Sequence, residues 1–457
     1  MKTTSPTTKA LIFTGLASIA LGTSSFTQAQ VSEAEAAKLG AELTPYGAER
    51  AGNADGSIPE WTGGLKETPA GYQAGGLRPN PYASDAVQMT ITGANYKDYA
   101  DKLTAGAKAL FKKYPDTFKM PVYQTRRSFA APQWIYDNVA KNATSATLSA
   151  DGNGIENAAA GIPFPIAQSG AEAVWNHNLR WAGKGTYKDF SSYTVFENGQ
   201  INLGGGKAWE SFPYYKKSEP SAADDIYFQL LVQYAQPTRR KGEVILLRDP
   251  MNQSENPRQA WQYIPGQRRV RRAPTVAFDT PNAQFSGQAT YDDAYMFNGS
   301  PERYNWKLVG KQEMYIPYNN YKFINEAAAG PEAFATPNFP NPDLERWELH
   351  RVWVVEGELK DGKRHIYGKR RFYFDEDSWL MVANDAFDGR GQLWRAGFAH
   401  VSHFYDQETT VLRGYWLADM LNGAYALNEV DNKPLVLNEG EANNFYTPQS
   451  VRKLSRR

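Results

Sequence analysis

A long succession of short β-patterned segments after Val122 most constrains the fold. Turn signals such as Asn198-Gly199, Lys241-Gly242 and Asp361-Gly362 separate these segments. Neither a long linker nor a repeat of fixed period interrupts them. We therefore predict an α+β protein built on one large antiparallel sheet. The predicted strands are Ala171–Trp181, Thr186–Glu197, Ile226–Gln236, Glu243–Arg248, Gln259–Ile264, Arg268–Arg272, Tyr304–Val309, Glu345–Glu356, His365–Phe374, Trp379–Asp385 and Leu393–His403.

The aromatic content agrees with a large sheet. Aromatic residues make up 13% of the chain, with 27 Tyr and 12 Trp, and such residues favour strands. Aromatic rings also line sites for apolar ligands. We interpret most of these rings as sheet core and a minority as possible ligand contacts.

Helices are predicted mainly before Val122. Ser32–Leu43 begins with Ser32 and Glu35 at capping-box spacing. Asn95–Tyr114 carries apolar residues at helical spacing and ends before Pro115. Phe323–Pro342 is rich in Ala, Pro and Asn and is predicted to be a loop with a short helix.

The first 29 residues are typical of a cleavable secretory signal. Lys2 and Lys9 precede an apolar stretch of about 13 residues, Ala10–Gly22, which is too short to span a bilayer comfortably. Thr27 and Ala29 supply small residues for cleavage after Ala29. We expect export to the periplasm.

Cysteine is absent, which excludes disulfides, thiolate metal sites and an acylated N-terminal cysteine. We therefore expect no lipid anchor. The formal charge of +1 argues against a generic nucleic-acid binder.

Several motifs suggest chemistry only weakly. His400 and His403 would point to opposite faces of a strand, so they cannot share a metal there. Asn53–Glu60 resembles part of a calcium loop but lacks its first and twelfth ligands, and an Asx-turn is the better interpretation.

Two other segments are interpreted as turns. Asn202–Ala208 fails the phosphate-loop pattern and is predicted to be a flexible turn. The acidic run Asp375–Asp377 is predicted to be a hairpin turn, and the sequence singles out no pair among its 49 acids for catalysis. We predict no enzyme activity, no catalytic residues, no metal and no cofactor.

The run Trp261–Pro274 places four arginines, two aromatics and a Pro-Gly turn in one strand-like segment. In a strand, Arg269 and Arg271 would share one face. One interpretation is a solvated strand paired with nearby acids. The other is an anion or partner contact, because arginine binds carboxylate or phosphate in a bidentate manner.

Motifs across most of the chain resemble the domain-of-unknown-function 1329 family, and the chain is similar to the wider group of outer-membrane lipoprotein-sorting-like proteins. The motifs are Gly47–Gly64, Asp98–Leu103, Gly161–Ile166, Trp175–His177, Trp261–Pro274 and Asp388–Arg395. The resemblance implies an antiparallel half-barrel with helices packed in or across its concave face. We then expect a signal peptide at 1–29, an N-terminal helical and loop extension at 30–121, and a half-barrel domain with a C-terminal helical extension at 122–457.

The resemblance also implies envelope function without established catalytic residues. Our leading hypothesis is a periplasmic carrier for a lipid-like or other hydrophobic ligand. The alternative is an accessory subunit that carries nothing and binds a resistance-nodulation-division type exporter or an outer-membrane protein. The residues predicted to contact the ligand are Trp261, Tyr263, Arg269, Arg271, Trp353 and Trp394.

Overall fold

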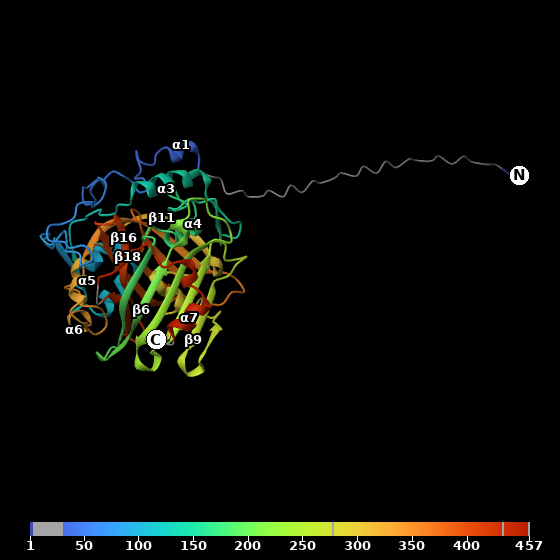
Figure 1. Cartoon of the computed structure of the whole chain (residues 1–457). Helices are drawn as coiled ribbons and strands as arrows, with labels where there is room; N and C mark the ends of the chain where they lie inside the picture. Colours follow the sequence, from blue (N-terminus) through green and yellow to red (C-terminus); the bar gives the residue numbers. More distant parts are fainter. Residues whose placement is uncertain (3–30, 277, 432–433, 456–457) are drawn as a thin grey trace.

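The computed structural model describes residues 1–2, 31–276, 278–431 and 434–455. Its main element is a 16-stranded sheet in the order β1-β2-β12-β13-β14-β15-β16-β17-β5-β6-β7-β8-β9-β10, with β11 paired to β12 and β18 paired to β5. Within this sheet, the strand pairings of the described residues are antiparallel except for a single parallel contact of Trp347 with Val122. The sheet curls without closing, so it is a half-barrel (Figure 1).

The strands are β1 Met89–Thr92, β2 Lys119–Val122, β3 Thr147–Leu148, β4 Ile155–Glu156, β5 Gly185–Val195, β6 Ile201–Ser211, β7 Ile226–Gln236, β8 Val244–Pro250, β9 Gln259–Ile264, β10 Arg269–Arg272, β11 Tyr304–Pro317, β12 Trp347–Leu359, β13 Lys369–Asp375, β14 Met381–Phe387, β15 Leu393–Phe404, β16 Thr409–Asp419, β17 Tyr425–Asp431 and β18 Val436–Asn438. The α-helices are α1 Glu33–Ala36, α2 Ala105–Lys113, α3 Gln133–Ser145, α4 Gly170–Asn178, α5 Tyr321–Ala327, α6 Pro331–Phe334 and α7 Pro448–Leu454. The 3₁₀ helices are η1 Tyr96–Lys102, η2 Pro213–Lys216, η3 Thr238–Arg240, η4 Pro265–Gln267, η5 Ala283–Phe285, η6 Tyr291–Met296, η7 Pro301–Arg303 and η8 Asn443–Phe445.

Most predicted strands are present, but Ala171–Trp181 is wrong. This segment forms helix α4 because Ser169 and Glu172 make a complete capping box at its start. The helix then buries Ala173, Val174 and His177, whose spacing matches a helical face.

The flexible turn predicted at Asn202–Ala208 is also wrong, because these residues lie in strand β6. Its glycines allow close approach of neighbouring segments. A Cβ atom at Gly206 would lie 2.2 Å from the Gln233 carbonyl oxygen, and one at Gly204 would lie 2.8 Å from the Gln284 side chain.

The helix predicted at Asn95–Tyr114 divides into η1 and α2. Thr104 caps α2 by accepting a hydrogen bond from the Ala107 N–H at 3.0 Å. The buried Asp385 carboxylate of β14 accepts the next N–H groups, from Ala105 at 3.0 Å and Gly106 at 2.7 Å. Tertiary contacts therefore place a new helix start inside a continuous apolar pattern.

Other predictions at the N-terminal side are confirmed in part. The Ser32 and Glu35 capping box is present, but α1 is shorter than the predicted Ser32–Leu43 helix. Asp55 accepts the Ser57 N–H at 2.9 Å, which confirms the Asx-turn. The boundary expected between the N-terminal extension and the half-barrel domain, at residues 121/122, lies within β2.

The predicted signal peptide lies outside the described residues apart from its first two positions. Among the described residues, no helix has the length and apolar character needed to cross a membrane.

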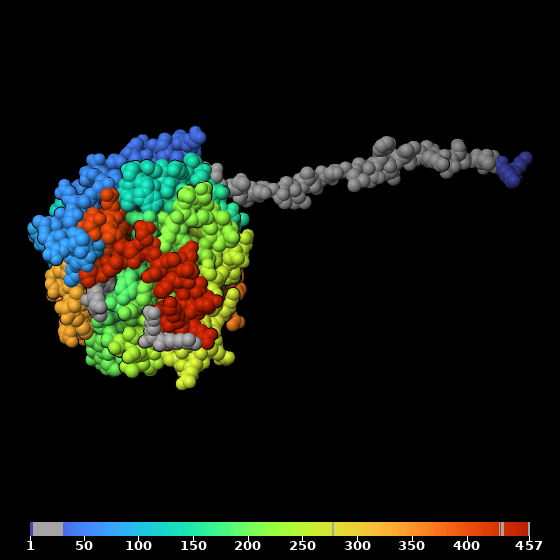
Figure 2. Space-filling view, viewed as in Figure 1, coloured from blue at the N-terminus to red at the C-terminus, as the bar shows by residue number. Residues whose placement is uncertain are grey.

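The two faces of the sheet are covered by different elements. We call the face bearing Phe190, Ala208 and Val232 the inner face, and residues 278–298, including η5 and η6, pack on it. On the outer face, α7 packs on β8–β10, and the C-terminal segment lies over the strands (Figure 2). Helix α2 packs on β14 and β15.

Buried ion pairs hold η6 on the inner face. Arg370 lies 3.1 Å from Asp292 and 2.8 Å from Asp293, and all three residues are buried. Burial alone would raise the pKa of the Asp292 carboxyl, but Arg370 and His365 lower it well below its usual value. Ion pairs that are buried from water therefore join the sheet to residues 278–298.

Replacing Asp385 tests the start of α2. We expect Asp385→Ala to lower the free energy of unfolding by about 3 kcal/mol, because buried N–H groups lose their acceptor. Urea unfolding measures the change. The exposed-turn variant Asp361→Ala should change it by less than about 0.5 kcal/mol, and equal losses would contradict this role of Asp385.

His403 predicts a pH dependence of stability. Burial lowers its pKa from 6.5 to about 3, so its contribution is complete above pH 6.5 and is lost as pH falls toward 3. Between pH 6.5 and 5 the loss is about 2 kcal/mol. His403→Gln has no such titration, so between pH 6.5 and 5 its free energy of unfolding should fall by about 2 kcal/mol less than that of the original protein. Urea unfolding at each pH measures the difference. Parallel curves for the two proteins would exclude the effect.

Candidate functional site

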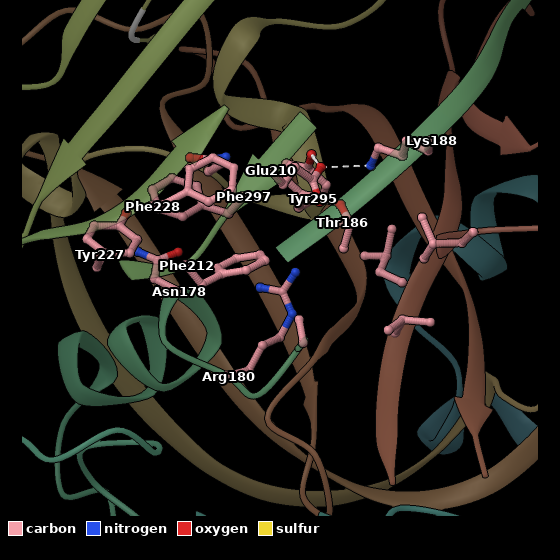
Figure 3. Close-up of a pocket in the computed structure, with 15 residues that line it drawn as sticks. Asn178, Arg180, Thr186, Lys188, Glu210, Phe212, Tyr227, Phe228, Tyr295 and Phe297 are labelled. Atoms are coloured by element: carbon pink, nitrogen blue, oxygen red, sulfur yellow. Dashed lines mark hydrogen bonds and ion pairs between the residues drawn. The ribbon is translucent and has the colours of Figure 1, made fainter. Parts of the chain in front are cut away.

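A cavity on the inner face combines aromatic walls with charged groups. We call it the Arg180 pocket, and its volume is about 50 Å³. It lies between the segment that follows α4, strands β5–β7 and β16, and the end of η6 (Figure 3). Its lining residues are Asn178, Arg180, Ala182, Thr186, Lys188, Glu210, Phe212, Tyr227, Phe228, Tyr295, Phe297, Asn298, Val411, Leu412 and Leu435.

Arg180 is a cation without a carboxylate partner among the described residues. Its Nη1 donates to the His177 carbonyl at 2.6 Å, but its buried Nε has no hydrogen-bond partner in the described part of the chain. Burial lowers the pKa of Arg180, which shows that the surroundings disfavour its charge. A guanidinium in this state favours an incoming anion, which would supply the missing acceptor.

Helix α4 positions this group. Leu179 ends the helix, and the His177 and Trp175 carbonyls accept the Leu179 N–H. His177 accepts the Met381 N–H through Nδ1 at 3.0 Å and donates from Nε2 to the Tyr295 carbonyl at 3.0 Å. The helix end, β14 and η6 are therefore tied together beside Arg180.

Asn178 adds a second unpartnered donor to the same pocket. Its Nδ2 is buried and has no hydrogen-bond partner among the residues described. Buried donors are rarely left in this state in folded proteins. With Arg180, the pocket presents two donors suited to oxygen acceptors such as a carboxylate.

A buried ion pair forms the opposite wall. Lys188 lies 2.8 Å from Glu210, which also accepts from Thr186 and Tyr295 (Figure 3). Burial alone would raise the pKa of the Glu210 carboxyl, but Lys188 and the two hydroxyl donors hold it below its usual value. Glu210 is therefore ionised and engaged, which makes it a poor general base near neutral pH.

The remaining wall is aromatic. Phe212 and Phe228 have ring centroids 5.4 Å apart, and Phe228 lies 6.2 Å from Tyr295 in an edge contact. Tyr227 and Phe297 complete this wall. Such a surface suits the apolar part of a ligand.

A second cavity lies next to the first, and we call it the Phe190 pocket. Its volume is about 70 Å³, and Tyr295 and Asn298 line both cavities. Its walls include Phe190, Val232 and Leu247 from the inner face of the sheet. Tyr295 thus separates a charged pocket from a mainly apolar one.

A larger groove of about 840 Å³ lies beside α3 and α4, near Val31. Its carboxylates are engaged in local structure. Glu172 caps α4, and Asp151 accepts from Ser149 and Ser254. We therefore place the candidate site at the Arg180 pocket.

The structure does not bring the six predicted ligand residues together, and none lines these three cavities. Trp261 and Tyr263 lie on the outer face against α7. Arg269 and Arg271 share the opposite face, as predicted, and are exposed on the terminal strand β10.

The other two predicted residues lie elsewhere. Trp353 stacks on Trp379 with ring centroids 6.1 Å apart. The Trp394 indole donates to Asp419 at 3.0 Å. Ligand binding by the six residues stays a prediction.

The comparisons with known proteins decide the family. The model for "Protein of unknown function (DUF1329)" matches residues 90–452. The uncharacterized protein PA3922 of Pseudomonas aeruginosa is 42% identical over 452 residues, which cover 98% of each chain. This chain belongs to the DUF1329 family. The family resemblance drawn from the sequence motifs is confirmed.

Solved structures similar to this DUF1329 protein include a DUF1329 family protein from Desulfovibrio piger, with a TM-score of 0.42, 14% identity, and coverage of 61% of this chain and 95% of that one. An outer membrane lipoprotein-sorting protein domain from Vibrio parahaemolyticus has a TM-score of 0.42 and 14% identity, with coverage of 62% and 97%. The LolA superfamily protein NE2245 from Nitrosomonas europaea has a TM-score of 0.37 and 11% identity, with coverage of 62% and 98%.

Sequence reasoning missed the charged groups of the DUF1329 pocket. Lys188 left a signal, since it alternates with Thr186 and Phe190 in a predicted strand and so shares their face. The sequence carries no such signal for Arg180, because Ala171–Trp181 was predicted to be a strand and not a helix that ends beside the pocket. Only the fold brings the end of α4 to β5 and β6.

Removing one member of the buried pair should destabilise this DUF1329 protein strongly. We expect Lys188→Met to cost about 3–5 kcal/mol of unfolding free energy, because Glu210 stays buried without that cation. Adding Glu210→Gln should recover part of the loss. Urea unfolding of the single and double variants measures both, and an additive loss in the double variant would refute this account.

Proposed function

We propose that this DUF1329 protein is a periplasmic binding or carrier protein for a hydrophobic ligand that bears an acidic group. The observation that carries the proposal is Arg180, a cation with an unpartnered buried Nε beside an aromatic wall. The acidic group would lie at Arg180 and Asn178. The expected signal peptide supports the periplasmic location.

The apolar part of the ligand would extend toward the Phe190 pocket. The two cavities hold only a few water molecules as they stand. We infer that the Tyr295 side chain is displaced when a longer chain enters. Its hydroxyl bond to Glu210 would be exchanged for burial of apolar ligand surface, at about 25 cal/mol per Å².

The arrangement favours binding over catalysis. Among the residues that the structure describes, Glu210 is the only carboxylate that lines the Arg180 pocket, and it is already held by Lys188, Thr186 and Tyr295. A carboxylate with a lowered pKa and three partners has little capacity to move protons. A cation beside an apolar wall instead selects amphiphilic anions.

A second candidate function rests on β10. This strand ends the sheet order, and Arg269, Arg271 and Arg272 are exposed on it. An unpaired edge with arginines suits an acidic partner strand or surface. We propose on this basis an accessory role with an exporter or an outer-membrane protein.

Ligand binding distinguishes the two functions. Native mass spectrometry of the protein from its own envelope, with lipid extraction, should first reveal a co-purifying amphiphile. We then expect added fatty acids to bind more tightly than fatty alcohols of equal length, and Arg180→Met to weaken fatty-acid binding about 10-fold or more. The double variant Arg269→Glu, Arg271→Glu should bind as the original does if the ligand occupies the Arg180 pocket, which neither residue lines. Weaker ligand binding by this variant would instead support the sequence-based prediction for these two arginines.

Circular dichroism confirms that each variant is folded, and Arg180→Lys tests whether charge alone suffices. Equal affinity of Arg180→Met and the original protein would refute the role of Arg180. An absence of any bound amphiphile would favour the accessory role, and a loss of partner crosslinking in the β10 double variant would support it.

A further inference from the structure

A buried cluster of one histidine and two aspartates, none of which lines the Arg180 pocket, forms a second candidate site. His350 lies on β12, Asp375 ends β13, and Asp377 lies in the turn before β14. Each is at most 2% exposed. One ligand atom from each lies within 4.8 Å of the others. We infer that these three side chains form a binding site for one divalent transition-metal ion.

The histidine has one ring nitrogen directed at the cluster as an acceptor. His350 Nε2 lies 3.0 Å from the Glu348 carboxylate, which can only accept, so we assign the ring proton to Nε2. That leaves a lone pair on Nδ1. Nδ1 lies 3.9 Å from Asp375 Oδ1.

Asp375 presents an acceptor that lacks any donor. Its Oδ2 accepts from the Tyr318 hydroxyl at 3.1 Å and from the Ser378 N–H at 3.0 Å. Its Oδ1 is buried and has no hydrogen-bond partner within the described ranges. Two lone pairs therefore face each other in a site closed to water, and a cation between them removes this repulsion.

The neighbouring groups match the outer shell of a metal site. A metal-binding histidine usually donates its other ring N–H to a carboxylate, as His350 does to Glu348. Tyr318 and Ser378 orient Asp375, and Arg127 orients Asp377 with contacts of 2.9 and 2.6 Å. These contacts position the His350 and Asp375 side chains before any ion enters.

Metal binding requires the ligand atoms to move closer together, since the structure places them within 4.8 Å of one another. Zinc bonds of about 2.0–2.2 Å place two tetrahedral ligand atoms roughly 3.4 Å apart. The His350 to Asp375 distance is thus longer by a few tenths of an ångström. Asp377 must adjust most, because both of its oxygens already accept from Arg127. One imidazole and two carboxylates suit Zn²⁺, and Mn²⁺ or Fe²⁺ as competitors.

The site would tie the N-terminal segment to the sheet. Arg127, which holds Asp377, also donates to the carbonyl oxygens of Glu49 and Arg50 at 2.8 and 3.1 Å. An ion at Asp377 would strengthen the same junction. Metal binding should therefore appear as added thermal stability, independently of any ligand in the Arg180 pocket.

The test uses the full chain after dialysis against a chelator, with ZnCl₂ as the probe. Isothermal titration calorimetry and elemental analysis should give about one Zn²⁺ per chain, and saturating Zn²⁺ should raise Tm by about 3 °C or more. We expect Asp375→Asn and His350→Gln each to weaken binding about 10-fold or more. His403→Gln, a matched change at a buried histidine on β15, should bind as the original does.

Crystals soaked in ZnCl₂ keep the inference testable if a variant fails to fold. An anomalous peak within bonding distance of His350 Nδ1 and Asp375 Oδ1 would support it. A peak elsewhere only, no uptake of Zn²⁺, or unchanged affinity in folded Asp375→Asn would overturn it.

Discussion

The contacts of Arg370 with Asp292 and Asp293 are the interaction on which the rest of the structure depends. A curled sheet of this size has an inner face that must be filled, and here residues 278–298 fill it. Those residues contain little regular structure, so apolar contact alone would position them weakly. The buried charges give the segment one position, since any displacement would leave an ion without its partner. Tyr295 and Phe297, which line the Arg180 pocket, are placed by the same contacts.

The pairing of buried charges distinguishes Arg180 from the other charged groups on the inner face. Lys188 and Glu210 are paired on the inner face, whereas Arg180 has no acid to pair with among the described residues. Folding leaves this guanidinium near aromatic rings at a cost, and a bound anion would offset that cost. The exposed arginines of β10 bear no such cost, because water solvates them. The contrast shows that arginine content alone does not distinguish a buried guanidinium from a solvated one.

The sequence predicted the sheet better than the site. The strands Ile226–Gln236 and Gln259–Ile264 are confirmed at both ends, because strong alternation and turn residues are local signals. Ala171–Trp181 was wrong because the apolar residues of α4 also read as a strand over so short a span. The break at Thr104 depends on Asp385, which is distant in sequence. Local patterns cannot contain such partners.

By itself, the sequence determined the family, the sheet-dominated architecture and the shared face of Arg269 and Arg271. These follow from motifs and from the two-residue period of a strand, which need no partner. Only the tertiary structure decided which charges are buried and which are left without a counter-ion. Asp375–Asp377 forms the predicted turn, yet its carboxylates are buried against His350 and Arg127. Burial depends on elements that meet only when the sheet curls, and it governs what a charged group can bind.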